Sequence, residues 1–148
     1  MFHTEKRRKL EEMMTNQQKK KTDIPKWGTY LRERWRGRFA SHLSLEEQKE
    51  IGMDGFLWHL CSWGKVECLE KEAAINAFHQ QSKHTCTLFY QFTQEAYLFE
   101  NAADLSVKEL PYTDGHMDYS DLYVMDWEEN WTFVMTHESD CGPYFIQK

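Results

Sequence analysis

Two runs of β-prone residues near the C-terminus flank a short polar stretch, and this pattern limits the possible folds more than any other part of the sequence. Residues 121–125 and 130–136 are rich in β-branched and aromatic side chains, and between them lies Asp126-Trp127-Glu128-Glu129. Such runs joined by a short polar turn are typical of a β-hairpin. The sequence therefore predicts an antiparallel sheet at this end of the chain.

Upstream segments add strands and one helix to this hairpin. Residues 85–92 favour a strand, residues 96–99 a second strand paired with it, and residues 103–110 a turn of helix. Residues 56–63 are apolar on both alternate faces and indicate a buried strand, with a short helix as the alternative. Ala73, Ala74, Ala77 and Phe78 recur at helical spacing within residues 70–81. Strand, helix and strand in that order predict one right-handed crossover.

The first third of the chain has helical patterns. Residues 5–21 contain many helix formers. In residues 26–39, a large apolar side chain recurs every four residues, which predicts a helix whose apolar ridge packs on the rest of the domain. The ridge consists of Trp27, Leu31, Trp35 and Phe39. Ser44 and Glu47 form a capping-box pattern, which predicts a third helix ending near Gly52.

These elements together predict an α+β fold, in which N-terminal helices precede a mostly antiparallel sheet with one crossover helix. The chain has 148 residues, the size of one ordinary domain. We expect a basic helical arm over residues 1–22 and a single α+β domain over residues 23–148.

Charge is distributed unevenly between the arm and the body. Residues 1–38 hold 12 Lys and Arg against 5 Asp and Glu, whereas the remaining residues hold 6 against 19. Attraction between the two parts, or between subunits, is the simpler interpretation. The Arg residues around Trp35 also suit nucleic acid, but the acidic body would repel that polyanion, so we rank nucleic acid second.

The distribution of apolar residues also indicates the cellular compartment. No apolar run approaches the roughly 18 residues of a membrane span, and the first residues lack the apolar segment of a secretion signal. We therefore expect a cytoplasmic protein without membrane contact. The four cysteines, Cys61, Cys68, Cys86 and Cys141, are then expected to be reduced thiols.

The titratable candidates for chemistry are His59, His137 and Glu138. In an extended strand, His137 shares the face of Trp131, while Glu138 points to the opposite face. The pair therefore needs a partner such as His59 to form a catalytic or metal site. The alternative, that each histidine is satisfied by a backbone carbonyl, is the more frequent case. Cys-x-x-Cys hooks, phosphate-binding glycine loops and nucleophile elbows do not occur, so we expect no metal and no cofactor.

A second candidate site is an acidic run over residues 114–129 that contains no Lys or Arg. Its members are Asp114, Asp118, Asp121, Asp126, Glu128 and Glu129. Such a face would speed association with a basic protein, as in proteins that neutralise basic toxins, although a merely solubilising face is an equal alternative. Our leading interpretation is a non-enzymatic interaction module of this kind. A small metal-binding protein or hydrolase with a His/Glu site is the alternative.

Several short blocks resemble the signature of a family of bacterial proteins of unknown function. They are Leu57-Trp58-His59 with Ser62, Asp121 with Tyr123, Trp131-Thr132 with Thr136-His137-Glu138, and Gly142-Pro143-Tyr144-Phe145, and the likeness covers roughly residues 27–146. The resemblance implies a bacterial source and a small soluble fold. It carries over no catalytic residue.

Overall fold

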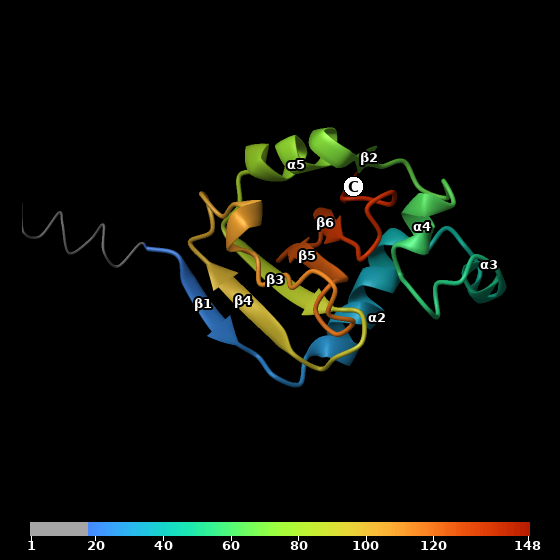
Figure 1. The fold of residues 1–148 in the computed structure, drawn as a ribbon, viewed down its shortest axis with the longest axis horizontal. Coiled ribbons are helices and arrows are strands. Elements are labelled where there is room, and N and C mark those ends of the chain that lie inside the picture. Colours follow the sequence, from blue (N-terminus) through green and yellow to red (C-terminus); the bar gives the residue numbers. More distant parts are fainter. Residues whose placement is uncertain (1–17) are drawn as a thin grey trace, which may run out of the picture.

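A single antiparallel sheet organises the computed structural model, which describes residues 18–148 (Figure 1). The strands stand in the order β1-β4-β3-β5-β6-β7-β2, and each neighbouring pair is antiparallel. Their bounds are β1 Lys20–Asp23, β2 Leu69–Glu70, β3 Thr85–Tyr90, β4 Ala96–Glu100, β5 Leu122–Asp126, β6 Trp131–Met135 and β7 Tyr144–Gln147. The central strands β3, β5 and β6 are buried along most of their length.

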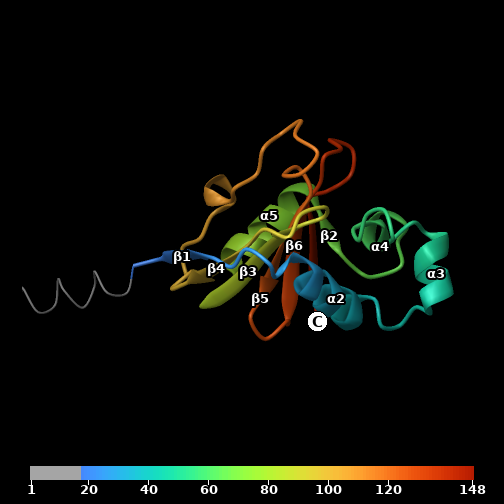
Figure 2. The same cartoon turned by 90° about the horizontal axis from the view of Figure 1, so that it is seen from below.

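Helical layers cover both faces of this sheet. The helices are α2 Gly28–Phe39, α3 Leu45–Glu50, α4 His59–Ser62, α5 Lys71–Gln80 and the 3-10 turn η1 Val107–Glu109. One core cluster joins α2 and residues 51–61 to one face of the sheet, and the other joins α5 and residues 102–110 to the opposite face. Figure 2 shows α2 and the segment around residues 101–121 on opposite sides of the strands. The molecule is therefore a three-layer α+β structure.

Much of the predicted local structure is present. The hairpin of β5 and β6, the pairing of β3 with β4, and the helix over residues 71–80 all occur. Ser44 caps α3 as predicted: its hydroxyl accepts from the backbone N–H of Glu47, and the Glu47 carboxylate accepts from the backbone N–H of Ser44. A 3-10 turn lies within residues 103–110.

The predicted strand over residues 56–63 is wrong, because this segment forms turns and the short helix α4. Leu57, Trp58, Leu60 and Cys61 are buried, and this spacing is helical rather than alternating. The short helix that was the alternative for this segment is present at residues 59–62, and the crossover that started from a strand here is not confirmed. Instead, α5 joins the two-residue strand β2 to β3. These two strands point in the same direction, because three strands of an antiparallel sheet lie between them.

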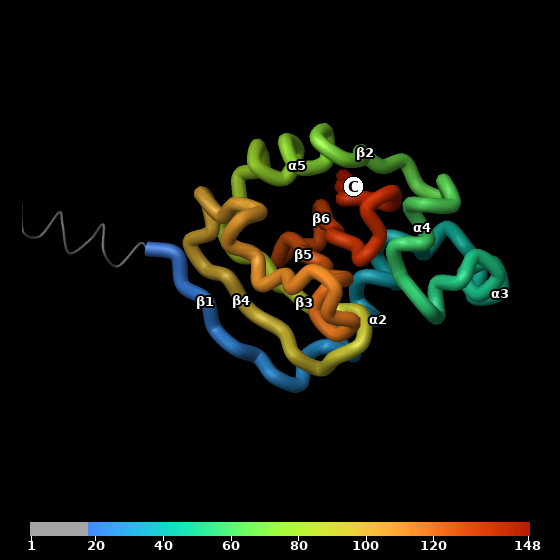
Figure 3. The backbone as a smooth tube through the Cα atoms, in the orientation of Figure 1, coloured from blue at the N-terminus to red at the C-terminus, as the bar shows by residue number. Residues whose placement is uncertain are grey.

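The predicted arm over residues 1–22 lies mostly outside the described residues, and so does most of the helix predicted over residues 5–21. Residues 20–22 are not helical, because they belong to β1, which pairs with β4 at the edge of the sheet (Figure 3). This part of the predicted arm is therefore a strand of the domain.

The apolar ridge of α2 packs on the sheet through three of its four members. Leu31, Trp35 and Phe39 are buried, whereas Trp27 is 41% exposed and precedes the helix. The indole Nε1 of Trp35 donates to Oγ1 of Thr132 on β6 at 2.9 Å, which fixes α2 against the strand.

Candidate active site

A buried carboxylate lies at the end of the sheet where β5 begins. Asp121 is only 2% exposed and accepts three hydrogen bonds. Its Oδ1 accepts from Nε1 of Trp58 at 2.8 Å and from the backbone N–H of His137 at 3.0 Å. Its two oxygens also face Nδ1 of the His137 ring, each at 3.0 Å. A buried charge is tolerated when it is paired and hydrogen-bonded in this way.

The imidazole of His137 is held between two carboxylates. Nδ1 lies against Asp121, and Nε2 lies 3.4 Å from Oε1 of Glu138. The His137 side chain is 35% exposed and the Glu138 side chain 52%. A proton on Nδ1 is donated to Asp121, which leaves Nε2 on the accessible side of the ring as an acceptor or donor.

Strand register explains why these residues meet although they are far apart in sequence. Leu122 is paired with Met135, so Asp121 and Thr136 stand at the next step, where both strands end. Beyond Met135 the chain turns, with the Thr136 hydroxyl bound to the carbonyl groups of Glu138 and Cys141. The predicted alternation therefore stops before His137, and the expectation that Glu138 points away from His137 is wrong.

A small cavity opens beside His137. It has a volume of about 290 Å³ and is lined by Phe56, Phe92, Gly115, Met117, Ser120, Asp121 and His137. The ring centroids of Phe56 and His137 are 5.0 Å apart, and those of Phe56 and Phe92 are 5.4 Å apart. An apolar wall with a few polar groups at one side is typical of a site for a small molecule.

His59 contacts the same aromatic residues but is directed elsewhere. Its ring lies 5.6 Å from Phe56 and 4.8 Å from Trp58, and its Nδ1 bonds the carbonyl of Gly52 at 3.0 Å. Gly52 has φ +82°, and a Cβ there would lie 2.7 Å from the same nitrogen. Of the three predicted catalytic candidates, His137 and Glu138 therefore meet, whereas His59 is held by a backbone carbonyl. Within residues 18–148, no group of three or more His, Cys, Asp or Glu side chains is arranged to hold a metal ion.

A buried polar layer supports the segment that carries Phe56 and Trp58. Gln91 accepts the backbone N–H of Leu57 at 3.0 Å and the hydroxyl of Tyr123, which in turn accepts the backbone N–H of Trp58 at 3.3 Å. Burial raises the pKa of Tyr123 well above its ordinary value, so the phenol stays protonated and donates to Gln91. This network fixes residues 57–58 and, through Trp58, the Asp121 carboxylate.

None of the four cysteines lines the cavity beside His137. Burial raises the pKa of Cys141 and raises that of Cys86 to about 12. A hydrogen bond with Cys68 raises the pKa of Cys61 well above its ordinary value and lowers that of Cys68. Among the residues that line this cavity, His137 therefore has no thiol to activate, and a proton-transfer role would involve water or a bound molecule.

The acidic run does not form one continuous face. Asp114, Asp118 and Glu128 are exposed, but Asp121 is buried in the site just described. Glu129 forms an ion pair with Arg34, with an Nη2 to Oε1 distance of 2.6 Å, and Asp126 accepts the backbone N–H of Asn130. Strand β5 separates Asp121 from Asp126, so the run is divided between the two ends of the sheet.

Sequence reasoning missed the role of Asp121, which was grouped with the acidic run. It also missed Trp58 as a donor to that carboxylate. The available signal was the position of Asp121 as the first residue of one predicted strand of the hairpin and of His137 directly after the other. Once the register of β5 against β6 is known, these positions place Asp121 and His137 at the same end of the sheet.

Comparison with known proteins gives a family. The model of DUF4275, a domain of unknown function, matches residues 8–145. No curated protein and no solved structure matches the chain. Among the described residues, no helix is long and apolar enough to cross a membrane.

Proposed function

Because the chain belongs to the DUF4275 family, whose description assigns no activity, we propose from the site itself that the protein is a small hydrolase using acid–base catalysis at His137. The observation that carries this proposal is the contact between the buried Asp121 carboxylate and Nδ1 of His137 beside a cavity. A histidine whose ring is oriented by a buried carboxylate and whose second nitrogen can exchange a proton is the usual arrangement of a general base, and Oε1 of Glu138 lies 3.4 Å from that second nitrogen, Nε2.

Each residue has a distinct role in the proposed reaction. Asp121 is the positioning residue, because its buried carboxylate contacts Nδ1 of His137 and holds the ring in place. Nε2 of His137 takes the proton of a water molecule whose oxygen adds to the electrophilic centre of the substrate, and it returns that proton to the departing oxygen. Phe56, Phe92 and Met117 offer apolar contacts to the rest of the molecule. The substrate class is therefore a small ester or phosphoester with an apolar portion.

The experiment is a hydrolysis screen with chromogenic carboxylic esters, phosphomonoesters and phosphodiesters. General acid–base catalysis contributes on the order of 10²–10⁴ in rate, so His137→Asn should lose at least about a hundredfold. His42→Asn is the matched control, because His42 is exposed and its Nε2 contacts the carbonyl of Lys65. The proposal fails if no compound class is hydrolysed faster by the wild type than by His137→Asn.

Recognition of a basic protein in the bacterial cytoplasm is the second candidate function, and it rests on a smaller set of residues than the sequence suggested. Its support is the exposure of Asp114, Asp118 and Glu128 to solvent. Exposed carboxylates without nearby cations accelerate encounter with a cationic surface. This candidate needs no contribution from Asp121, and variants of the exposed residues distinguish it from the hydrolase.

A further inference from the structure

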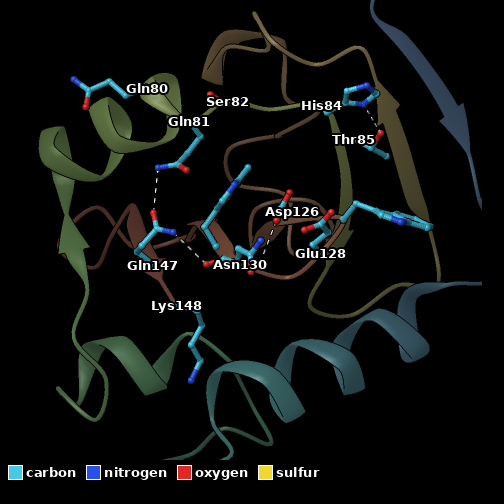
Figure 4. Close-up of a pocket in the computed structure, with 12 residues that line it drawn as sticks. Gln80, Gln81, Ser82, His84, Thr85, Asp126, Glu128, Asn130, Gln147 and Lys148 are labelled. Atoms are coloured by element: carbon cyan, nitrogen blue, oxygen red, sulfur yellow. Dashed lines mark hydrogen bonds between the residues drawn. The ribbon is translucent and has the colours of Figure 1, made fainter.

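A second, larger hollow lies at the opposite end of the sheet from His137. It has a volume of about 640 Å³ and is formed by the end of α5, the start of β3, the β5–β6 turn and the end of β7 (Figure 4). Its lining is mostly polar and includes four amides, two carboxylates, two indoles, one histidine and one lysine: Gln80, Gln81, Ser82, His84, Thr85, Asp126, Trp127, Glu128, Asn130, Trp131, Gln147 and Lys148. We call it the amide groove. None of its lining residues belongs to the His137 cavity.

Hydrogen bonds order the polar side of the amide groove. Nε2 of Gln81 donates to Oε1 of Gln147 at 3.2 Å, and Nε2 of Gln147 donates to the carbonyl of Asn130 at 3.4 Å. Figure 4 shows these residues as a connected row, with the Asp126 carboxylate beside Asn130. Within residues 18–148, the side chains of Glu128 and Asn130 make no hydrogen bond in the protein. The groove therefore offers planar donors and acceptors on an ordered scaffold.

An exposed tryptophan borders this polar row. Trp127 is 55% exposed, whereas Trp131 is 3% exposed and packs on Phe78 and Phe145 beneath the groove. Trp127 does not lie on a loose loop, because its backbone N–H donates to the carbonyl of Thr85 at 3.0 Å.

Glu129, two residues after Trp127 in the same turn, is fixed from the side of helix α2. The carboxylate of Glu129 accepts from Arg34 at 2.6 and 2.7 Å, and its carbonyl accepts from Nε of Arg38 at 2.8 Å. An indole held open to solvent on a doubly anchored turn presents a large apolar face next to hydrogen-bonding groups.

This combination favours one class of ligand. A pyranose ring has an apolar C–H face that packs on an indole and a rim of hydroxyl groups that amides and carboxylates bind in pairs. The lining holds two carboxylates, Asp126 and Glu128, against one lysine, Lys148, so it has no excess of positive charge that would favour phosphate or another anion. We propose that the amide groove binds a neutral oligosaccharide, with Trp127 stacking on one sugar ring and Gln81, Asn130 and Glu128 bonding its hydroxyls. The volume is in the range of known ligand sites.

The test is a titration of the full chain, labelled with ¹⁵N, with maltohexaose, cellohexaose, laminarihexaose and chitohexaose at millimolar concentration. At least one of these should shift the indole signal of Trp127 and the amide signals of Gln81 and Asn130. Trp127→Ala should weaken that binding about fivefold, which is the loss expected for one aromatic contact.

Trp63→Ala is the matched control, because Trp63 is 58% exposed but does not line the groove. It should bind as the wild type does, and so should His137→Asn. The proposal is overturned if none of the four saccharides shifts the groove signals, or if Trp127→Ala binds as tightly as the wild type.

Discussion

Replacing Trp35 with alanine should remove a large part of the stability of the domain. Its side chain is fully buried between α2 and the sheet, with ring centroids 5.4 Å from Phe39 and 5.5 Å from Tyr123. Truncation leaves a cavity and should cost about 3–5 kcal/mol. Domains of this size have a total stability of about 5–15 kcal/mol, so the variant should be close to unfolding.

A second substitution separates the ring from its hydrogen bond. Trp35→Phe keeps an aromatic ring but loses the bond from Nε1 to Oγ1 of Thr132, so it should cost about 1–2 kcal/mol. Trp27→Ala is the matched control on the same ridge, because Trp27 is largely exposed, and its cost should stay below about 1 kcal/mol.

The assay is urea unfolding followed by far-ultraviolet circular dichroism, with the slope against urea compared between variants. Equal midpoints for Trp35→Ala and Trp27→Ala would refute the reasoning. That result would mean that the ridge of α2 does not hold the helix against the sheet.

Further predictions concern the site, the capping box and the acidic residues. Asp121→Asn should keep the fold but lower the hydrolytic rate of the proposed enzyme, as measured by its kcat, without a comparable change in KM, because it leaves the apolar wall intact. Hydrogen bonds from Ser44 lower the pKa of Glu47 below its ordinary value of 4.5. The Glu47 carboxylate therefore stabilises the folded protein fully at a pH above 4.5, and this contribution is lost as the pH falls through the lower pKa of the folded state. Melting temperatures should therefore show Glu47→Gln less stable than the wild type at neutral pH, with the difference closing under acid, and a pH-independent difference would contradict this. Replacing Asp114, Asp118 and Glu128 with Asn and Gln should slow association with any basic partner recovered from a lysate at low salt while leaving hydrolysis unchanged. Recovery of the same partners at the same rate would remove the second candidate function.

Local signals in the sequence were sufficient for part of the fold. The capping box of Ser44 and Glu47 depends only on residues three apart, and the β5–β6 hairpin depends on two adjacent runs and one turn. Both could be predicted because the interacting groups are close in the chain.

Elements whose state is set by distant partners could not be predicted in this way. Residues 56–63 are too short for periodicity to separate strand from helix, and two of their backbone N–H groups, those of Leu57 and Trp58, are satisfied by the distant side chains of Gln91 and Tyr123. Likewise, the link between Asp121 and His137 depends on the register of β5 against β6. A shift of one residue would place their side chains on opposite faces.

The contact between Asp121 and His137 is the central claim, and the protonation of the two ring nitrogens tests it most directly. Long-range ¹H–¹⁵N correlation spectra at a pH where the ring is neutral distinguish a proton on Nδ1 from one on Nε2. The structure predicts that the His137 proton is on Nδ1, bonded to Asp121, and that Asp121→Asn changes this preference. A neutral ring that carries its proton on Nε2 in the wild type would contradict the proposed general base.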